Sequence, residues 1–156
     1  MILTKEQEMI RDAARGFSQG ELVPIAPEWD RIGGFPEAVI SRMGELGFLG
    51  MLIPEAWGGS DTGHVAYALA LEEMAAGDGG CCTVMSVQNS VVNVPILREG
   101  SIAQKERFLR PLAQGEMLGG FALTEPQAGS DASNIKVRAR LDGSHYILSG
   151  TKQFIT

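Results

Sequence analysis

The sequence predicts an α+β protein: an amino-terminal all-α domain, residues 1–115, followed by the first strands of an antiparallel β domain, residues 116–156. Apolar residues recur at helical spacing in the first part, whereas they alternate with charged residues near the carboxyl end. Asp142 and Gly143 stand between that alternating run and a second apolar run, as is typical of a hairpin turn. Helices are therefore expected first and strands afterwards.

The first helices are predicted from their start and stop signals. Thr4 is followed three residues later by Gln7, and this capping-box pattern satisfies free amides at a helix start. A short helical turn is expected over residues 21–26. Pro36 suits the first position of a further helix, which Gly47 is expected to end in a left-handed conformation.

The next segment, residues 48–54, is apolar and is predicted to be extended. Two longer helices are predicted over residues 63–76 and 79–98. The second of them is apolar or small on nearly all sides and should be buried. Ser101 and Gln104 form another capping box, and Pro111 is expected to kink or end the helix that follows.

Strands are predicted in the last third of the chain. Residues 121–124 form a short candidate, and residues 135–141 alternate with period two, which predicts one dry face. Residues 146–148 form the partner strand, and residues 152–156 should begin another. Because a domain that ended there would keep an unpaired edge, the chain is expected to be truncated relative to the native protein.

Composition and charge exclude several classes of function. The formal net charge is −6, and the one local basic run, residues 136–140, is interpreted as the solvated side of a strand, so nucleic-acid binding is not expected. The start of the chain lacks the pattern of a signal peptide, and residues 81–97 are too polar to span a bilayer. A cytoplasmic location is therefore expected.

Neither the cysteines nor the histidines predict a metal site. Cys81 and Cys82 are adjacent, which disfavours a disulfide, and both are interpreted as core residues. His64 and His145 have no partner at ligand spacing. No metal is expected.

The segment with the most chemical information is residues 121–131, FALTEPQAGSD, which we call the first motif. Pro126 predicts a turn, and Gly129 before Ser130 would expose backbone amides that can bind an anion. The spacing matches neither a Walker loop nor the dinucleotide-binding glycine pattern. The residues alone leave two possibilities open, a ligand-binding loop and an ordinary surface turn.

The first motif resembles the flavin-binding signature of the acyl-CoA dehydrogenase family. The second half of that signature follows at the expected separation as residues 146–156, YILSGTKQFIT, which we call the second motif. Residues 47–59, GFLGMLIPEAWGG, and residues 104–116, QKERFLRPLAQGE, also resemble the family. Four such segments in the same order make the resemblance extend over the whole chain.

The resemblance implies that the β domain is the start of an antiparallel barrel and that the cofactor is FAD. It implies that the backbone at Leu123 and the hydroxyl of Thr124 bond the flavin ring, and that Ser130 lies where FAD and the acyl-CoA substrate meet. Phe154 stands where the family often has Trp. The complete set of implied cofactor-binding residues is Phe121, Ala122, Leu123, Thr124, Gly129, Ser130, Phe154, Ile155 and Thr156.

The reaction that the resemblance implies is α,β-dehydrogenation of an acyl-CoA, with electrons passed on to an electron-transfer flavoprotein by a homotetramer. The family's catalytic Glu belongs to a carboxy-terminal domain, and Glu125 is not used as that base, so no catalytic residue is assigned. Three alternatives stay open: an acyl-CoA oxidase, a flavin monooxygenase-like relative, and a non-catalytic module that binds acyl-CoA or a partner.

Overall fold

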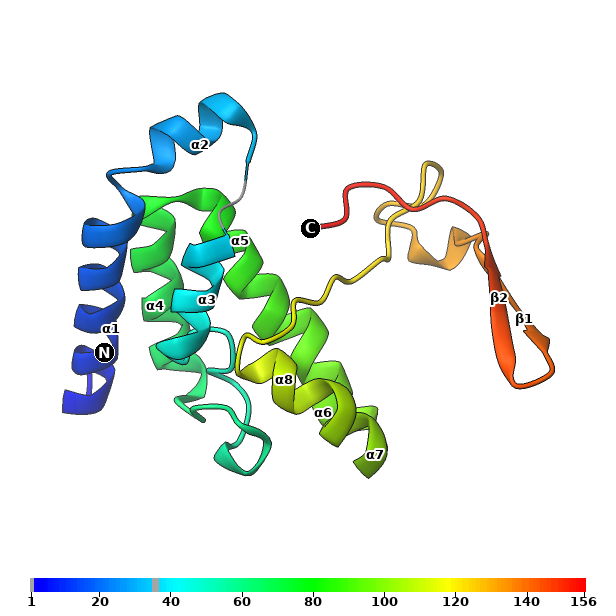
Figure 1. Cartoon of the computed structure of the whole chain (residues 1–156), viewed down its shortest axis with the longest axis horizontal. Coiled ribbons are helices and arrows are strands. Elements are labelled where there is room, and N and C mark those ends of the chain that lie inside the picture. The colour runs from blue at the N-terminus through cyan, green and yellow to red at the C-terminus, as the bar shows by residue number, and fades with distance from the viewer. Residues whose placement is uncertain (1, 35–36) are drawn as a thin grey trace. The chain divides into compact units, whose positions relative to one another are not determined.

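The structure, a computed structural model, describes residues 2–34 and 37–156. The chain forms two compact units, Met1–Gly119 and Gly120–Thr156. The first unit is helical, and the second contains a two-stranded antiparallel hairpin (Figure 1). The structure thus confirms a predominantly helical part followed by antiparallel strands.

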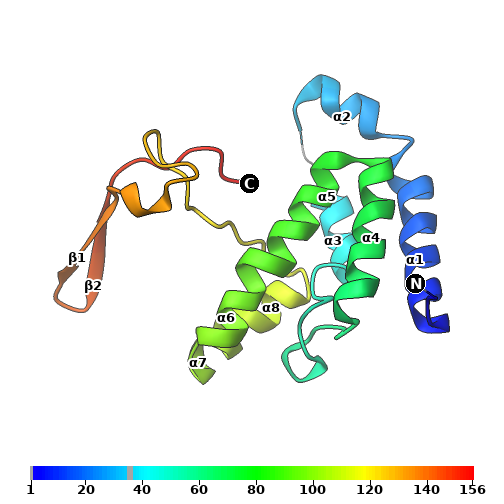
Figure 2. The same ribbon diagram turned by 180° about the vertical axis from the view of Figure 1, so that it is seen from behind.

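The helical unit contains eight α-helices among its described residues, and shorter segments join or extend them. The α-helices are α1 (Lys5–Phe17), α2 (Ala26–Ile32), α3 (Glu37–Glu45), α4 (Gly63–Gly77), α5 (Gly79–Ser86), α6 (Val94–Glu99), α7 (Ile102–Gln104) and α8 (Arg110–Ala113). The π-helical segments are η1 (Ser18–Leu22), η3 (Val87–Asn93) and η4 (Lys105–Leu109), and η2 (Glu55–Trp57) is a 3₁₀ turn. Figures 1 and 2 show α1 and α4 side by side, and α5 follows α4 directly.

Side chains cap several helices where the sequence predicts it. The Thr4 hydroxyl accepts the Gln7 N–H (3.2 Å), and the Gln7 side chain accepts the Thr4 N–H (3.0 Å). Ser101 and Gln104 repeat this arrangement at the start of α7. Asp78 caps α5 and was not anticipated. These caps confirm the two predicted capping boxes.

Each π-helical segment ends two residues before a proline: Pro24, Pro95 and Pro111. At η4, the Arg110 N–H donates to the Lys105 carbonyl five residues earlier. Proline has no N–H, and its ring would clash with the preceding turn of a regular α-helix. The wider turn relieves that clash. The predicted helix over residues 79–98 is therefore continuous, and α8 contains Pro111 in its first turn.

Three local expectations need correction or fall outside the structure. The helical turn predicted for residues 21–26 is misplaced, because η1 starts earlier and ends at Leu22, and α2 begins only at Ala26. Residues 48–54 are not extended but form consecutive turns, in which the Gly50 N–H bonds the Gly47 carbonyl. Apolar composition does not distinguish an extended segment from a buried turn. The predicted helix start at Pro36 lies outside the described residues.

The main core of the helical unit lies between α1, α3, α4 and α5. Its largest members come from helices and from the turns after α3, and include Leu22, Met43, Leu49, Met74 and Met85. Cys81 belongs to this core, as its apolar character predicts, and Cys82 packs at its edge. Burial of such side chains is the dominant stabilising contribution in a unit of this kind.

Three buried amide side chains on η3 connect this core to its loops. Asn89 donates to the Phe48 carbonyl (2.7 Å), and its oxygen accepts the Leu52 N–H (3.3 Å). Gln88 donates to the Leu112 carbonyl in α8 and to the Met117 carbonyl, and Asn93 donates to the Leu49 carbonyl. The amides thereby satisfy backbone groups that the irregular turns leave unpaired.

The second unit contains strands β1 (Arg138–Asp142) and β2 (His145–Ser149), which pair antiparallel from Arg138↔Ser149 to Asp142↔His145. Gly143 has φ +60°, as the predicted turn requires. Neither face of the hairpin is covered, and Leu148 is 72% exposed, so the expected dry face is absent from this fully described segment. An isolated hairpin has nothing to pack against.

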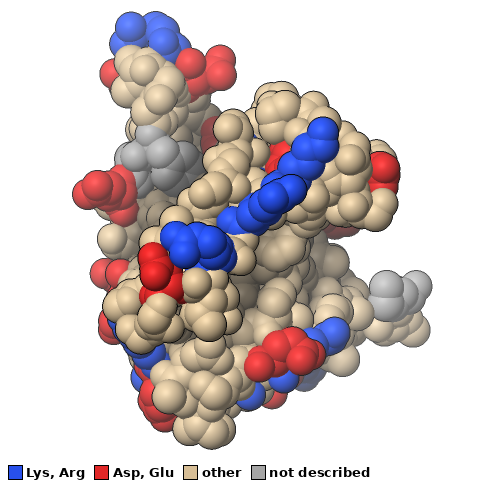
Figure 3. All heavy atoms as spheres, turned by 90° about the vertical axis from the view of Figure 1, so that its right-hand side faces the viewer, with Lys and Arg blue, Asp and Glu red and all other residues tan. Residues whose placement is uncertain are grey.

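The basic side of β1 is solvated, as predicted. Lys136, Arg138 and Arg140 are exposed, and alternation places them on one side of the chain. Figure 3 shows Lys and Arg side chains in a row on the face that it draws.

Two predicted strands, residues 121–124 and residues 152–156, are not strands in the structure. A strand needs a ladder of hydrogen bonds, and here one backbone bond joins the segments, from the Gln153 N–H to the Thr124 carbonyl (3.0 Å). The segments nevertheless lie next to each other, and this contact brings the two motifs together.

Candidate functional site

The first motif folds around a tight turn. The Glu125 N–H donates to the Ala128 carbonyl and the Ala128 N–H donates to the Glu125 carbonyl, both at 3.0 Å. Pro126 and Gln127 occupy the tip, where proline's fixed φ favours a turn. Gln127 and Asn134 brace this turn, because the Asn134 amide donates to the Gln127 carbonyl (3.1 Å). The turn predicted at Pro126 is confirmed.

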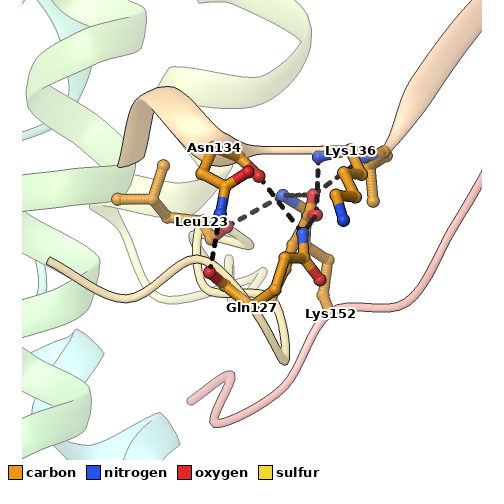
Figure 4. A network of polar contacts seen from close by, with 7 residues as sticks. Leu123, Gln127, Asn134, Lys136 and Lys152 are labelled. Carbon is orange, nitrogen blue, oxygen red and sulfur yellow. Dashed lines mark hydrogen bonds and ion pairs between the residues drawn. The ribbon is translucent and has the colours of Figure 1, made fainter. Parts of the chain in front are cut away.

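Glu125 lies at the centre of the second unit. It is 3% exposed, and within residues 120–156 only Ala128 shares its buried state. Its carboxylate accepts hydrogen bonds from the Lys136 N–H (2.7 Å), the Val137 N–H (3.0 Å), the Gln127 amide (2.5 Å) and the Lys152 ammonium (2.9 Å) (Figure 4). A buried charge needs this degree of pairing to be stable.

These donors determine how Glu125 titrates. Burial by itself raises the pKa of the Glu125 carboxyl, but the four hydrogen bonds outweigh burial and lower it to about 2. The carboxylate is therefore ionised at neutral pH, and both of its oxygens are occupied. A carboxylate in this condition is a poor general base, which agrees with assigning it no proton-abstracting role.

Lys152 links the second motif to the first. Its ammonium donates to the Glu125 carboxylate and also to the Leu123 carbonyl (2.8 Å). The Lys152 side chain is 22% exposed, so the pair is largely shielded from water. Together with the bond from Gln153 to Thr124, these contacts join positions 27 and 29 residues apart.

The structure brings some of the predicted cofactor-binding residues together. Leu123 and Thr124 lie beside the second motif through the bonds just described. Gly120, which precedes Phe121, approaches the Thr156 carbonyl so closely that a Cβ atom there would lie 2.9 Å from the oxygen. Ala122 is exposed in the same segment. Gly129 and Ser130 connect to the second motif only through the Glu125 turn.

Apolar side chains of both motifs are open to solvent. Phe121, Leu123 and Ile155 are each exposed, and Phe154 is 87% exposed. Phe154 also has φ +56°, a left-handed conformation that is unusual for an aromatic residue and often occurs at functional sites. These side chains could contact a flat, apolar ligand.

Polar groups of the same segments have no partner within the described chain. The hydroxyls of Thr124, Ser130 and Thr156 make no hydrogen bond to any described residue. The backbone N–H groups of residues 129–131 are likewise without an acceptor in the described chain. A Cβ atom at Gly129 would meet no other atom within 4 Å, so the space next to the Gly129 backbone is unfilled. Free amides and hydroxyls beside apolar side chains suit a ligand with a ring and a diphosphate.

Sequence reasoning missed the central role of Glu125 and Lys152. Glu125 could have been suspected, because it is a carboxylate directly before a proline turn. Apart from the nearby Gln127 amide, however, its donors come from residues 11 to 27 positions further along the chain. No local pattern indicates such a partnership.

The described residues contain no group of three or more His, Cys, Asp or Glu side chains arranged to hold a metal ion. His64 and His145 lie in separate units, on α4 and β2. Among the described helices, none combines the length and apolar character that crossing a bilayer requires.

Comparison with protein families identifies two matching models. The acyl-CoA dehydrogenase amino-terminal domain matches residues 4–116, and the acyl-CoA dehydrogenase middle domain matches residues 120–156.

Two curated relatives resemble the chain along its whole length. It is 40% identical over 156 residues to the 3-(aryl)acrylate reductase of Clostridium sporogenes, and the match covers 100% of this chain and 41% of that relative. It is 42% identical over 154 residues to the mitochondrial short-chain specific acyl-CoA dehydrogenase of Mus musculus, and the match covers 99% of this chain and 37% of that protein. The chain thus spans about two fifths of the length of the relatives it matches.

Solved structures agree with these matches. A chain from work on the electron transferring flavoprotein of Acidaminococcus fermentans and flavin-based electron bifurcation superimposes with a TM-score of 0.95 at 40% identity, and the match covers 99% of this chain and 41% of that one. A glutaryl-CoA dehydrogenase from Mycobacterium smegmatis in complex with FADH2 gives a TM-score of 0.93 at 38% identity, covering 98% and 39%.

Proposed function

Because this chain belongs to the acyl-CoA dehydrogenase family, we propose that it forms the amino-terminal part of an FAD-dependent enzyme that dehydrogenates acyl-CoA thioesters between the α and β carbons. One observation carries the proposal. The two motifs, which are separate in sequence, meet through Lys152 and Gln153 and place free polar groups next to exposed apolar side chains.

FAD, when bound, would supply the acceptor for the hydride that leaves the β carbon. The residues proposed to hold it are Phe121, Ala122, Leu123, Thr124, Gly129, Ser130, Phe154, Ile155 and Thr156. Thr124 and Thr156 would donate hydroxyl hydrogen bonds to the ring, and Phe154 would shield it from water. The amides of residues 129–131 would bind the diphosphate, and Ser130 would also lie beside the substrate.

The base that removes the α proton is expected to lie outside residues 1–156. Glu125 is the buried carboxylate of the second unit, and its four donors leave neither oxygen free. A general base must reach the proton that it abstracts. This chain is therefore assigned binding and alignment, and the 156-residue chain by itself is expected to retain FAD weakly and to be inactive.

The acyl group is left open within the class of acyl-CoA thioesters. The relatives act, by name, on short-chain acyl-CoA, on glutaryl-CoA and on an aryl acrylate. We further propose a homotetramer that passes electrons to an electron-transfer flavoprotein, and the similarity to a chain from the Acidaminococcus fermentans work supports such a partner.

The experiment uses the protein at the full length that its gene encodes. It is purified with FAD and assayed with a series of saturated acyl-CoA substrates and an artificial electron acceptor. An enoyl-CoA product, with bleaching of the flavin, is the expected result. Substrate-dependent oxygen uptake without the acceptor would instead identify an oxidase. A protein that binds neither FAD nor acyl-CoA would refute the proposal.

A pair of variants tests the site itself. Thr156→Val removes one proposed hydroxyl donor at nearly constant volume and should weaken FAD binding by about tenfold. Thr151→Val makes the same change at another exposed position of the second motif that is not assigned to the cofactor. It should bind FAD as the unaltered protein does.

A further inference from the structure

Glu125 and Lys152 form a shielded ion pair at the place where the two motifs meet (Figure 4). The pair is not a surface salt bridge, because the side-chain exposures are 2% for Glu125 and 22% for Lys152. Breaking a buried pair on one side leaves the other charge uncompensated. Its position therefore makes it a structural junction between the proposed flavin-binding segments.

Each member of the pair holds a different segment. One Glu125 oxygen accepts Lys152 and the Val137 N–H, and the other accepts the Lys136 N–H and the Gln127 amide. The carboxylate thus ties the first-motif turn to the chain that leads into β1. A neutral amide could not replace it, because an amide nitrogen would face donors instead of accepting from them.

Lys152 in turn fixes the orientation of one peptide group. Its ammonium donates to the Leu123 carbonyl at 2.8 Å. The described chain contains no cis peptide, and in a trans peptide the carbonyl and the following N–H point in opposite directions. The Thr124 N–H therefore points away from Lys152, and no described residue accepts its hydrogen bond.

The Thr124 carbonyl is also engaged, by the Gln153 N–H at 3.0 Å. Both carbonyls that flank the Thr124 N–H are thus bound to the second motif. The N–H is left as a free donor of fixed direction, next to the exposed side chains of Leu123 and Phe121.

We propose that Glu125 and Lys152 are positioning residues of the flavin site: the pair orients the Leu123–Thr124 peptide so that the Thr124 N–H is presented to the cofactor. The inference rests on the proposed function, since it assumes that FAD occupies this site. Preorganised donors of this kind bind a ligand without the cost of ordering them afterwards.

Three variants of the full encoded protein test the pair. Glu125→Gln and Lys152→Met should each weaken FAD binding by about tenfold or more, because each removes charge-assisted bonds that orient the site. The double variant should bind FAD about as weakly as the weaker-binding single variant, because both substitutions remove the same ion pair and their effects do not add. Lys136→Met is the matched control, since Lys136 contributes only its backbone N–H to the network.

Two further readouts separate positioning from folding. Amide hydrogen exchange at Val137 and Gln153 should accelerate in Glu125→Gln, whereas exchange in α4 should not change. Lys152→Arg keeps a cation with several donors and should recover much of the FAD affinity that Lys152→Met loses. The absorption spectrum of the bound flavin should also shift in Glu125→Gln, because the Lys152 charge is no longer compensated.

The outcomes distinguish this inference from the proposed function. If the unaltered protein fails to bind FAD, both are wrong. If it binds FAD, and Glu125→Gln binds equally well with an unchanged flavin spectrum, the positioning role is refuted and the flavoenzyme proposal survives. Equal FAD affinity of Lys152→Arg and Lys152→Met would also overturn the positioning role.

Discussion

Replacing Asn89 by alanine should destabilise the helical unit strongly. The Asn89 side chain is fully buried on η3 and makes three hydrogen bonds. Two of them serve the Phe48 carbonyl and the Leu52 N–H, which have no other partner among the described residues. Alanine cannot replace either contact. The variant therefore leaves two backbone groups of the turns after α3 unpaired.

The magnitude follows from the number of bonds. A net contribution of about 1 kcal/mol for each of the three hydrogen bonds amounts to about 3 kcal/mol. For a unit of this size, such a loss lowers Tm by about 10 °C. Urea unfolding followed by far-UV circular dichroism measures the change as a shift of the midpoint at constant m-value.

Asn93→Ala is the matched comparison. Asn93 is also fully buried on η3, but it donates one hydrogen bond, to the Leu49 carbonyl at 3.0 Å, and its own oxygen has no partner among the described residues. Its replacement removes one bond and also an unpaired buried oxygen, so it should cost only about 1 kcal/mol. Helix propensity changes equally in both variants and cancels. If Asn93→Ala costs as much as Asn89→Ala, the hydrogen-bond reasoning is wrong.

Three further predictions concern titration and strain. The pKa of Glu125 is lowered to about 2, below the value of about 4.3 in an unfolded chain, and Lys152 is the charged group that faces it. The contribution of the ionised Glu125 to stability is therefore complete above about pH 5 and is lost as pH falls toward 2. Protection of the Val137 amide from hydrogen exchange should decrease over this pH range as that contribution is lost. A midpoint of the decrease near pH 4.3 would contradict the prediction. Burial raises the pKa of the Cys81 thiol to about 12 and also raises that of Cys82, so a thiol reagent at pH 8 should modify the folded chain slowly and the urea-unfolded chain quickly. Equal rates in both states would exclude this. Phe154→Gly should relieve the strain of a left-handed backbone by about 1 kcal/mol, measured by amide exchange in the hairpin, and should nevertheless weaken FAD binding, measured by flavin titration. A variant in which stability and FAD affinity both fall would contradict the strain argument.

The features that could be predicted from the sequence are those decided within a few residues. Thr4 with Gln7 and Ser101 with Gln104 satisfy helix starts by contacts three residues apart, so the residue types suffice to identify them. The hairpin turn is equally local, because Gly143 alone supplies the positive φ. Resemblance in the two motifs also located the candidate site without any structure.

Other features depended on where distant parts of the chain meet. Apolar residues at 48–54 suit an extended segment and those at 121–124 suit a strand, but among the described residues no strand pairs with either segment. Alternation in β1 likewise predicts a dry face, and whether that face is dry depends on what packs on it.

By itself, the sequence determined the order of helices and strands, the helix caps, the hairpin turn and the membership of the family. Only the tertiary structure decided that Glu125 is a buried, ionised carboxylate and that Lys152 joins it to the Leu123 carbonyl. The reason is physical: caps and turns are completed by neighbours along the chain, whereas a buried charge is stable only if the fold brings its donors to it from segments far apart in sequence.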